Sequence, residues 1–204
     1  MTLLEEIPRG PLAEASIPVL ETKRLALRAP RLEDAKTVAA LANDRRIAEN
    51  VARIPHPYKK SDAESFITGA NKSGGEAVFL IALRDETIIG ACSLTKQDGV
   101  VAGPAPELGY WLGVDHWGKG YATEALHAVI DYAFTDLGHP ALTAAARVTN
   151  PLSRRVLEKC GFQWTGVGLC RIRAINSSAP IDRFRLERGI WSALKTWGRM
   201  KKVS

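Results

Sequence analysis

The segment from residue 107 to residue 148 constrains the fold most, because it predicts a strand, a glycine-rich turn, a long amphipathic helix and a second strand. Apolar residues recur along the helix at the spacing of one helix face, and Gly138 is expected to end it. They are Ala122, Ala125, Leu126, Val129, Ile130, Ala133, Phe134 and Leu137. The second strand covers Ala141 to Val148. Two strands joined through a helix predict a parallel crossover within one sheet.

Three runs of strand-forming residues, separated by turn residues, include the first strand of this segment. They are Ala77 to Leu83, Ile88 to Thr95 and Glu107 to Leu112, with turns at Asp85-Glu86-Thr87 and at Gly99, Gly103, Pro104 and Pro106. Because short turns join antiparallel neighbours, these runs predict an antiparallel meander.

The segments on either side add helices and strands. Before the meander, residues 24–28 alternate like a strand, residues 33–44 are expected to be helical, and a second helix is expected to begin near Ser61 after a loop that contains Pro55 and Pro57. After the crossover, Asn150 and Pro151 are typical of a helix start and Gly161 of its end. Two further strands are expected near residues 163–174 and 182–187.

The pattern as a whole predicts an α+β fold in a single domain, with a mixed central sheet flanked by helices. We expect an N-terminal arm over residues 1–20, because it contains three prolines, the domain over 21–195, and a basic tail over 196–204.

Charge and composition narrow the classes of function. The chain has 204 residues with 28 Lys and Arg against 22 Asp and Glu, a net charge of +6 that is spread along its length. This dispersed charge is compatible with nucleic-acid, ribosomal or anionic-cofactor partners, and the absence of a recognised nucleic-acid motif argues against nucleic acid. No apolar run approaches the ~18 residues of a membrane span, and the first residues do not resemble a secretory signal, so a cytoplasmic protein is expected.

Three cysteines, Cys92, Cys160 and Cys170, are an odd number without a Cys-x-x-Cys motif. They predict reduced thiols in or near the core. The histidines are not at ligand spacing with them, so no metal is expected.

The turn before the long helix is a candidate anion site. Gly118 and Gly120 allow a ligand to approach the backbone, the first N–H groups of the helix point outward, and Lys119 adds a positive charge. This pattern predicts a phosphate or pyrophosphate site, and a simple glycine turn before a helix is the alternative. Gly113 to Lys119 also matches seven positions of a P-loop, but Gly120 stands where that motif needs Ser or Thr, which disfavours an NTPase.

Two motifs at this separation are more specific than either glycine turn: ELGYWLGVDHWGKGYATEAL over 107–126 and NPLSRRVLEKCGF over 150–162. Together they resemble the GNAT family of N-acetyltransferases, in particular the branch that includes the ribosomal-protein-alanine N-acetyltransferases. LETKRLALRAPRLEDA over 20–35 and IPHPYKKSDAESFI over 54–67 fit that branch, and the resemblance extends from about Leu20 to Leu194.

The resemblance implies acetyl-coenzyme A as cosubstrate. Its pyrophosphate would lie on the turn from Trp117 to Ala122, where Trp117 departs from the Gln or Arg of the family pattern. Its pantetheine arm would pair with the strand Leu108 to Val114, which in this fold diverges from the next parallel strand. The cofactor-binding residues implied are Leu112, Val114, Trp117, Gly118, Lys119, Gly120, Tyr121, Ala122, Asn150 and Ser153. For Asn150, helix capping is an equally good role.

The expected reaction is direct attack of a neutral amine on the thioester, without an acyl-enzyme. Glu107 is the candidate base, with an exposed strand-end Glu as the alternative. Leu157 stands where many family members have the Tyr that protonates the thiolate, so Ser153 is the candidate acid, directly or through water, with an ordinary Ser in the first turn of a helix as the alternative. Tyr110 shares a strand face with Leu108 and Leu112 and belongs to the core or to the acceptor pocket. Cys92 and Cys160 are weak nucleophile candidates, because no His is placed to activate them.

The acceptor is expected to be a primary amine, on a protein N-terminus or a small molecule, with a ribosomal protein among the candidates. Segments 53–58 and 174–182 are expected to shape its site. A catalytically silent coenzyme A-binding module and a ribosome- or nucleic-acid-associated protein are the alternative functions, and a homodimer is left open.

Overall fold

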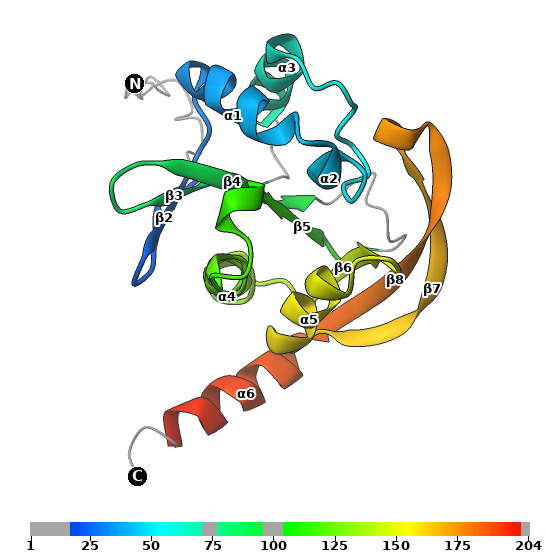
Figure 1. Ribbon diagram of the computed structural model, residues 1–204. Helices are drawn as coiled ribbons and strands as arrows, with labels where there is room; N and C mark the ends of the chain where they lie inside the picture. Colours follow the sequence, from blue (N-terminus) through cyan, green and yellow to red (C-terminus); the bar gives the residue numbers. More distant parts are fainter. Residues whose placement is uncertain (1–16, 71–76, 96–103, 201–204) are drawn as a thin grey trace, which may run out of the picture.

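A single sheet of eight strands organises the molecule (Figure 1). The computed structural model describes residues 17–70, 77–95 and 104–200, with side chains up to residue 197. The strands are β1 (Leu20–Glu21), β2 (Leu25–Arg28), β3 (Ala77–Leu83), β4 (Ile88–Thr95), β5 (Glu107–Leu112), β6 (Ala141–Arg147), β7 (Gln163–Ile172) and β8 (Ser177–Glu187). Their order across the sheet is β1-β2-β3-β4-β5-β6-β8-β7.

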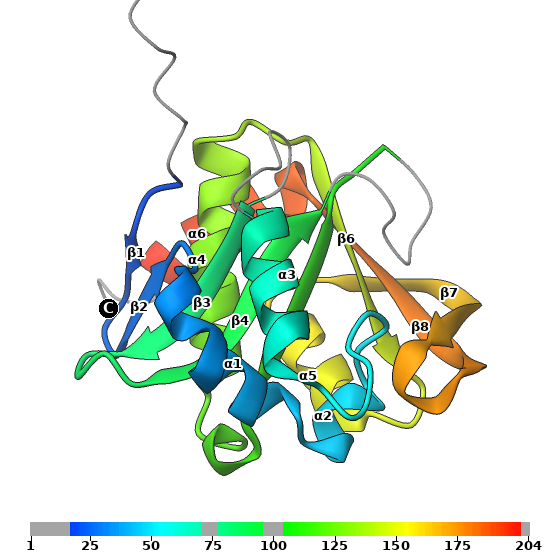
Figure 2. The same cartoon turned by 90° about the horizontal axis from the view of Figure 1, so that it is seen from above.

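Helices cover both faces of the sheet. They are α1 (Ala35–Ala42), α2 (Arg45–Ala48), α3 (Lys60–Ala70), α4 (Tyr121–Thr135), α5 (Pro151–Lys159) and α6 (Arg188–Met200), with 3-10 turns at Leu32–Asp34, Val114–His116 and Arg173–Ile175. Figures 1 and 2 show α1 to α3 on one face and α4 and α5 on the other, while α6 extends away from the body. The predicted mixed sheet flanked by helices is confirmed.

Both parts of the predicted topology are present. The strands β1 to β5 pair as antiparallel neighbours, and β5 pairs with β6 in parallel through the crossover helix α4. The parallel pairing consists of one residue pair, Glu107 with Thr143. Beyond this pair β5 and β6 separate, which opens the edge of β5.

Two apolar clusters hold the layers together. On one face Phe79 packs in a cluster with Phe134 of α4, and on the other Leu80 packs with Val38 of α1 and Ile67 of α3. Successive side chains of β3 therefore enter different clusters. Because helices cover both faces, β3 is a continuous apolar run rather than an alternating one.

Several element boundaries differ from the sequence expectation. The helix α4 ends at Thr135, so Leu137 lies beyond the buried stripe and is 42% exposed. The helix expected over 33–44 begins as a 3-10 turn and ends at Ala42. The strand β8 begins at Ser177 rather than 182 and forms a long hairpin with β7. The helix α6 was not expected, and it includes residues 196–200 of the predicted tail.

Some sequence expectations fall outside the described residues: the arm over 1–16, turn residues Gly99 and Gly103, and the tail beyond residue 200. In the three ranges described, no helix is long and apolar enough to cross a membrane.

A buried carboxylate ties β2 to the start of α1. Asp34 is 6% exposed and accepts two hydrogen bonds of 2.8 Å from the guanidinium of Arg28 and one of 2.7 Å from the backbone N–H of Arg31. Burial alone would raise the pKa of Asp34, but these hydrogen bonds outweigh it and leave the pKa below its ordinary value.

Replacing Asp34 with Asn should therefore lower the free energy of unfolding at pH 7 by ~2 kcal/mol. Because the pKa of Asp34 is lower in the folded state, its contribution is complete above the unfolded pKa of about 3.9 and is lost as the pH falls below it. Urea unfolding at pH 7 and pH 3 should show the gap between Asp34→Asn and wild type narrowing at pH 3. Glu33→Gln, in the exposed pair with Arg31, is the control and should change little. A gap that stays constant with pH would contradict this reading.

Candidate functional site

A cavity of about 1160 Å³ lies where β5 and β6 separate. Its described lining comes mainly from α2 and the following loop, α3, β4, β5, the turn before α4, the end of β6, the start of α5 and the β7–β8 hairpin. The predicted site residues that line it are Glu107, Leu112, Trp117, Gly118, Gly120, Tyr121, Ala122, Asn150 and Ser153. Val114 and Lys119 are not in this lining. The fold thus brings most of the predicted residues to one place.

The edge of β5 offers backbone groups to the cavity. The N–H of Gly113 donates to the carbonyl oxygen of Ile89 on β4 at 2.8 Å. Because the direction of these groups alternates along a strand, the N–H and C=O groups of Leu108, Tyr110 and Leu112 point away from β4. This is the side on which β6 has separated.

Two details differ from the expected backbone contacts. The strand ends at Leu112, and Val114 lies in a 3-10 turn, where its carbonyl oxygen accepts from the N–H of Trp117 at 3.1 Å. The indole N–H of Trp117 donates to the carbonyl oxygen of Leu112 at 2.8 Å. Of the two expected residues, Leu112 therefore has an N–H on the side facing the cavity, whereas Val114 is not part of the strand edge.

The turn before α4 has the backbone geometry of an anion site. Gly118 and Gly120 have φ values of 72° and 80°, a region that side chains disfavour. Gly120 is the N-cap of α4 and supplies no capping side chain. Since the first N–H groups of a helix have no acceptors within it, they and the helix dipole favour a phosphate here.

A contact from the start of the domain braces this turn. Arg24 donates from Nη1 to the carbonyl oxygen of Lys119 at 3.0 Å, and its Nε lies 2.7 Å from Oε2 of Glu124 in α4. Glu124 also accepts from Thr22 and from the N–H of Arg24. Burial would raise the pKa of Glu124, but these hydrogen bonds lower it overall. Sequence reasoning missed this brace, because its partners are a hundred residues apart.

On the opposite wall, α5 begins with the predicted cap. The side-chain oxygen of Asn150 accepts from the N–H of Ser153 at 3.1 Å. The hydroxyl of Ser153 lies 2.9 Å from that of Tyr110. Burial raises the pKa of Tyr110 to about 12, so its hydroxyl stays protonated near neutral pH. This hydroxyl pair was not predicted, although the strand face of Tyr110 was.

Successive residues of β5 face different layers of the molecule. Tyr110 packs against the cluster that contains Leu108, Leu112 and the apolar stripe of α4. Trp111 packs against the cluster formed with α1 and α3. By alternation Glu107 shares the face of Trp111, and Tyr110 has the opposite face. The candidate base and the hydroxyl pair are thus on two sides of one strand.

The cysteines lack the features of nucleophiles. Cys92 and Cys160 are buried, and burial raises the pKa of both thiols, that of Cys160 to about 12. Leu157 lies fully buried beside Cys160 in the core cluster and presents no polar group to the site. In the described part of the chain, no three or more His, Cys, Asp or Glu residues are grouped to hold a metal ion.

Comparison with known proteins agrees with this geometry. A family model described as "Acetyltransferase (GNAT) domain" matches residues 24–163. The uncharacterized N-acetyltransferase p20 of Bacillus licheniformis is 31% identical over 151 residues, 72% of this chain and 84% of that protein. The putative ribosomal N-acetyltransferase YdaF of Bacillus subtilis is 38% identical over 80 residues, 39% of this chain and 43% of that protein. A solved GNAT-family acetyltransferase from Bacillus anthracis has a TM-score of 0.72 at 20% identity, covering 84% of this chain and 99% of that one.

The glycine turn makes a testable prediction. A Cβ at Gly118 would meet no atom within 4 Å, so Gly118→Ala should act through its positive φ alone. Gly138, with a φ of 70° and the same open surroundings after α4, is the matched control. Both variants should lose ~1 kcal/mol of stability. Calorimetry should show coenzyme A binding about tenfold weaker for Gly118→Ala and unchanged for Gly138→Ala, and equal affinities would contradict an anion site at this turn.

Proposed function

Because the chain belongs to the GNAT family of acetyltransferases, whose cosubstrate is acetyl-coenzyme A, we propose that it transfers the acetyl group directly to a primary amine in a ternary complex. The observation that carries this proposal is the open edge of β5 between the glycine turn and α5. An extended chain with amide groups can pair with such an edge as an added strand would. Acetyl-coenzyme A, when bound, supplies the activated acetyl group.

Residues on the cavity wall fit the parts of this cosubstrate. The amides from Gly118 to Ala122 would bind the pyrophosphate, with Lys119 adding charge at the surface. The N–H of Leu112 or of Tyr110 would pair with the pantetheine arm or polarise the thioester carbonyl. Removal of one such donor from an acyl-transfer site costs about a hundredfold in rate.

Base and hydroxyl groups then act from two sides of β5. Glu107 accepts the proton of the attacking amine, directly or through water, on the face of α1 and α3. Ser153 stabilises the charge on the departing sulfur from the face of α4 and α5. Tyr110, whose hydroxyl lies 2.9 Å from Oγ of Ser153, is a positioning residue in this proposal: with Tyr110 as the donor, the Ser153 proton is free to point at the sulfur.

The acceptor in this proposal is a primary amine, and two kinds of molecule are candidates to carry it. The likeness to a putative ribosomal N-acetyltransferase supports a ribosomal protein as one candidate, and a small amine is the other. A cytoplasmic location fits both. A binding module without catalysis would bind coenzyme A and release no thiol with any amine.

Thiol release from acetyl-coenzyme A across a panel of amines tests the reaction, and Glu107→Gln tests the base. This variant should lower kcat about a hundredfold, with coenzyme A affinity unchanged, because it removes the proton acceptor and keeps the shape. Glu187→Gln, at the exposed end of β8, is the matched control and should behave as wild type. Full turnover by Glu107→Gln would remove Glu107 from the mechanism.

Replacing Tyr110 with Phe should lower kcat about tenfold without changing the KM for acetyl-coenzyme A, because the Ser153 hydroxyl loses its orientation. Ser153→Ala should cost more, and the double variant should be no slower than Ser153→Ala alone, since Tyr110 acts only through Ser153. Steady-state kinetics of the three variants measure this coupling. Additive losses would show that Tyr110 contributes independently of Ser153.

A further inference from the structure

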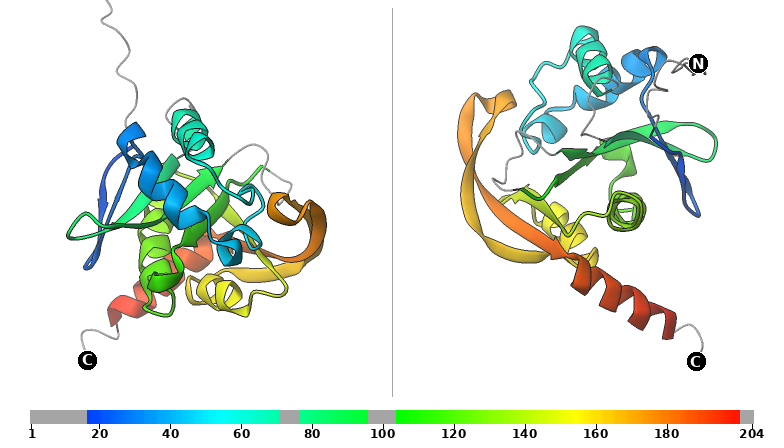
Figure 3. Two further views of the ribbon diagram at one scale, coloured as in Figure 1. Left: turned by 45° about the horizontal axis from the view of Figure 1, so that its top comes forward. Right: turned by 180° about the vertical axis from the view of Figure 1, so that it is seen from behind.

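The hairpin of β7 and β8 covers one side of the cavity. At its tip, the N–H of Arg173 donates to the carbonyl oxygen of Ala52 at 3.1 Å, and Nη1 of Arg173 donates to that of Arg53 at 3.4 Å. Both views in Figure 3 show this tip against the loop that follows α2. Cys170 of β7 lines the same cavity as Glu107. The hairpin therefore encloses the side from which an acceptor reaches the base.

Five arginines line the cavity in the described part of the chain. Arg46 is paired with Asp44 and Arg155 lies on α5, and we call the other three, Arg53, Arg147 and Arg173, the arginine cluster. Arg147 ends β6 and donates from Nη1 to the carbonyl oxygen of Glu49 at 2.8 Å. Its Nε is buried without a hydrogen-bond partner among the residues that the structure describes. An unpaired buried donor costs about 1–3 kcal/mol, so a shift of the Arg147 side chain that brought this nitrogen to a ligand oxygen would be favoured.

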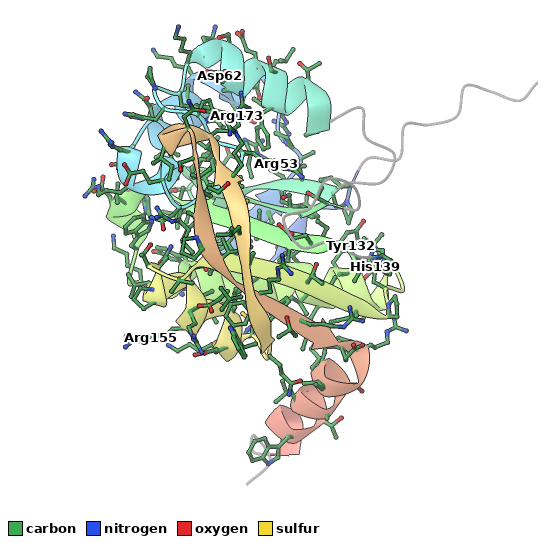
Figure 4. All side chains as sticks on the ribbon, turned by 90° about the vertical axis from the view of Figure 1, so that its right-hand side faces the viewer. Arg53, Asp62, Tyr132, His139, Arg155 and Arg173 are labelled. Carbon is green, nitrogen blue, oxygen red and sulfur yellow. The ribbon has the colours of Figure 1, made fainter. Side chains whose placement is uncertain are left out.

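The side chains of the cluster come from separate elements. Figure 4 shows Arg53 and Arg173 near Asp62 at the hairpin end of the molecule, whereas Arg155 lies apart from them, on α5. Arg53 and Arg173 are thus separate from the start of α5, where the predicted cofactor contacts Asn150 and Ser153 lie. Arg147, in contrast, precedes α5, and its carbonyl oxygen accepts from the N–H of Asn150 at 2.8 Å.

The charges of the cluster reach groups inside the cavity. Burial raises the pKa of Tyr58 to about 12, and the charge of Arg173 opposes this rise. Burial also raises the pKa of Cys170, Glu107 raises it further, and Arg53 opposes it. Arg173 therefore lies near Tyr58, and Arg53 near Cys170, and both of these residues line the cavity.

From this arrangement we infer that the acceptor carries an anionic group, a carboxylate or a phosphate, beside its reactive amine. Guanidinium groups bind both anions through paired hydrogen bonds. The acids in the described lining are Asp62 and Glu107, and Glu107 is the proposed proton acceptor for the amine. A polycationic amine would be repelled by the three arginines. The inference rests on the proposed acetyl transfer and specifies its substrate class.

Matched amine pairs test this inference: phosphoethanolamine against ethanolamine, β-alanine against its amide, and spermidine as a polycation. The anionic member of each pair should have a kcat/KM at least tenfold higher and should bind more tightly to the coenzyme A complex in calorimetry. Arg53→Glu should reverse the preference towards the neutral and cationic amines, because it replaces a positive charge with a negative one. The hairpin should stay in place, since the backbone oxygen of Arg53 that accepts from Arg173 is kept. Arg171→Glu, on β7 outside the described lining, makes the same charge change, is the matched control and should keep the wild-type preference.

The outcomes separate this inference from the proposed function. Equal or better use of neutral amines or spermidine, or a coenzyme A complex that binds no anionic amine more tightly than its neutral counterpart, would overturn the anionic acceptor. A fall in coenzyme A affinity for Arg53→Glu with an unchanged amine preference would overturn it too, by assigning the arginine to the cosubstrate. Absence of coenzyme A binding and of thiol release would instead defeat the acetyl transfer itself.

Discussion

The parallel pairing of β5 with β6 ends after one residue pair, and the site depends on this early end. Backbone N–H and C=O groups that are buried from water without a hydrogen-bond partner cost free energy. Two strands of a sheet therefore separate only where other partners or water replace the lost hydrogen bonds. Here the indole of Trp117 supplies one compensating hydrogen bond, to Leu112, and the cavity gives the other edge groups access to water or ligand. The Trp that departs from the family pattern thus has a structural task at the end of β5.

The alternation of side chains along β5 gives the site two chemically different sides. The face of Glu107 and Trp111 is turned toward α1 and α3, whereas the face of Tyr110 is turned toward α4 and α5. One strand can therefore separate a proton acceptor from hydroxyl donors by the width of the backbone. A helix could not do so with residues three apart, because these share a face.

The sequence predicted those elements whose apolar pattern is strong. The bounds of β3, β4 and β5 agree with expectation because buried runs end at clear turn residues, and α4 begins at its glycine turn. The start of β8, Ser-Ser-Ala-Pro-Ile, resembles a loop, and its strand conformation comes from pairing with β7. The helix α6 follows β8 without an intervening turn and includes Gly189, so local signals for its start are weak.

The site was predictable as a set of residues and only partly as a set of contacts. Motif positions placed Ser153 and Asn150 beside the cavity, but the partner of Ser153 is Tyr110, 43 residues away. Likewise no local pattern indicates that Arg147 and Arg173, on β6 and at the hairpin tip, line the same cavity. Such contacts follow from the topology of the whole sheet.

The brace between Arg24 and Glu124 has a consequence for protein engineering. The turn that bears Gly118 and Gly120 is fixed through the guanidinium of Arg24, which lies between the first two strands. A fragment spanning β5 and α4 alone lacks that guanidinium, and so would a foreign scaffold that received the loop. This turn is therefore not portable: it has to be transplanted together with the first strands of the chain.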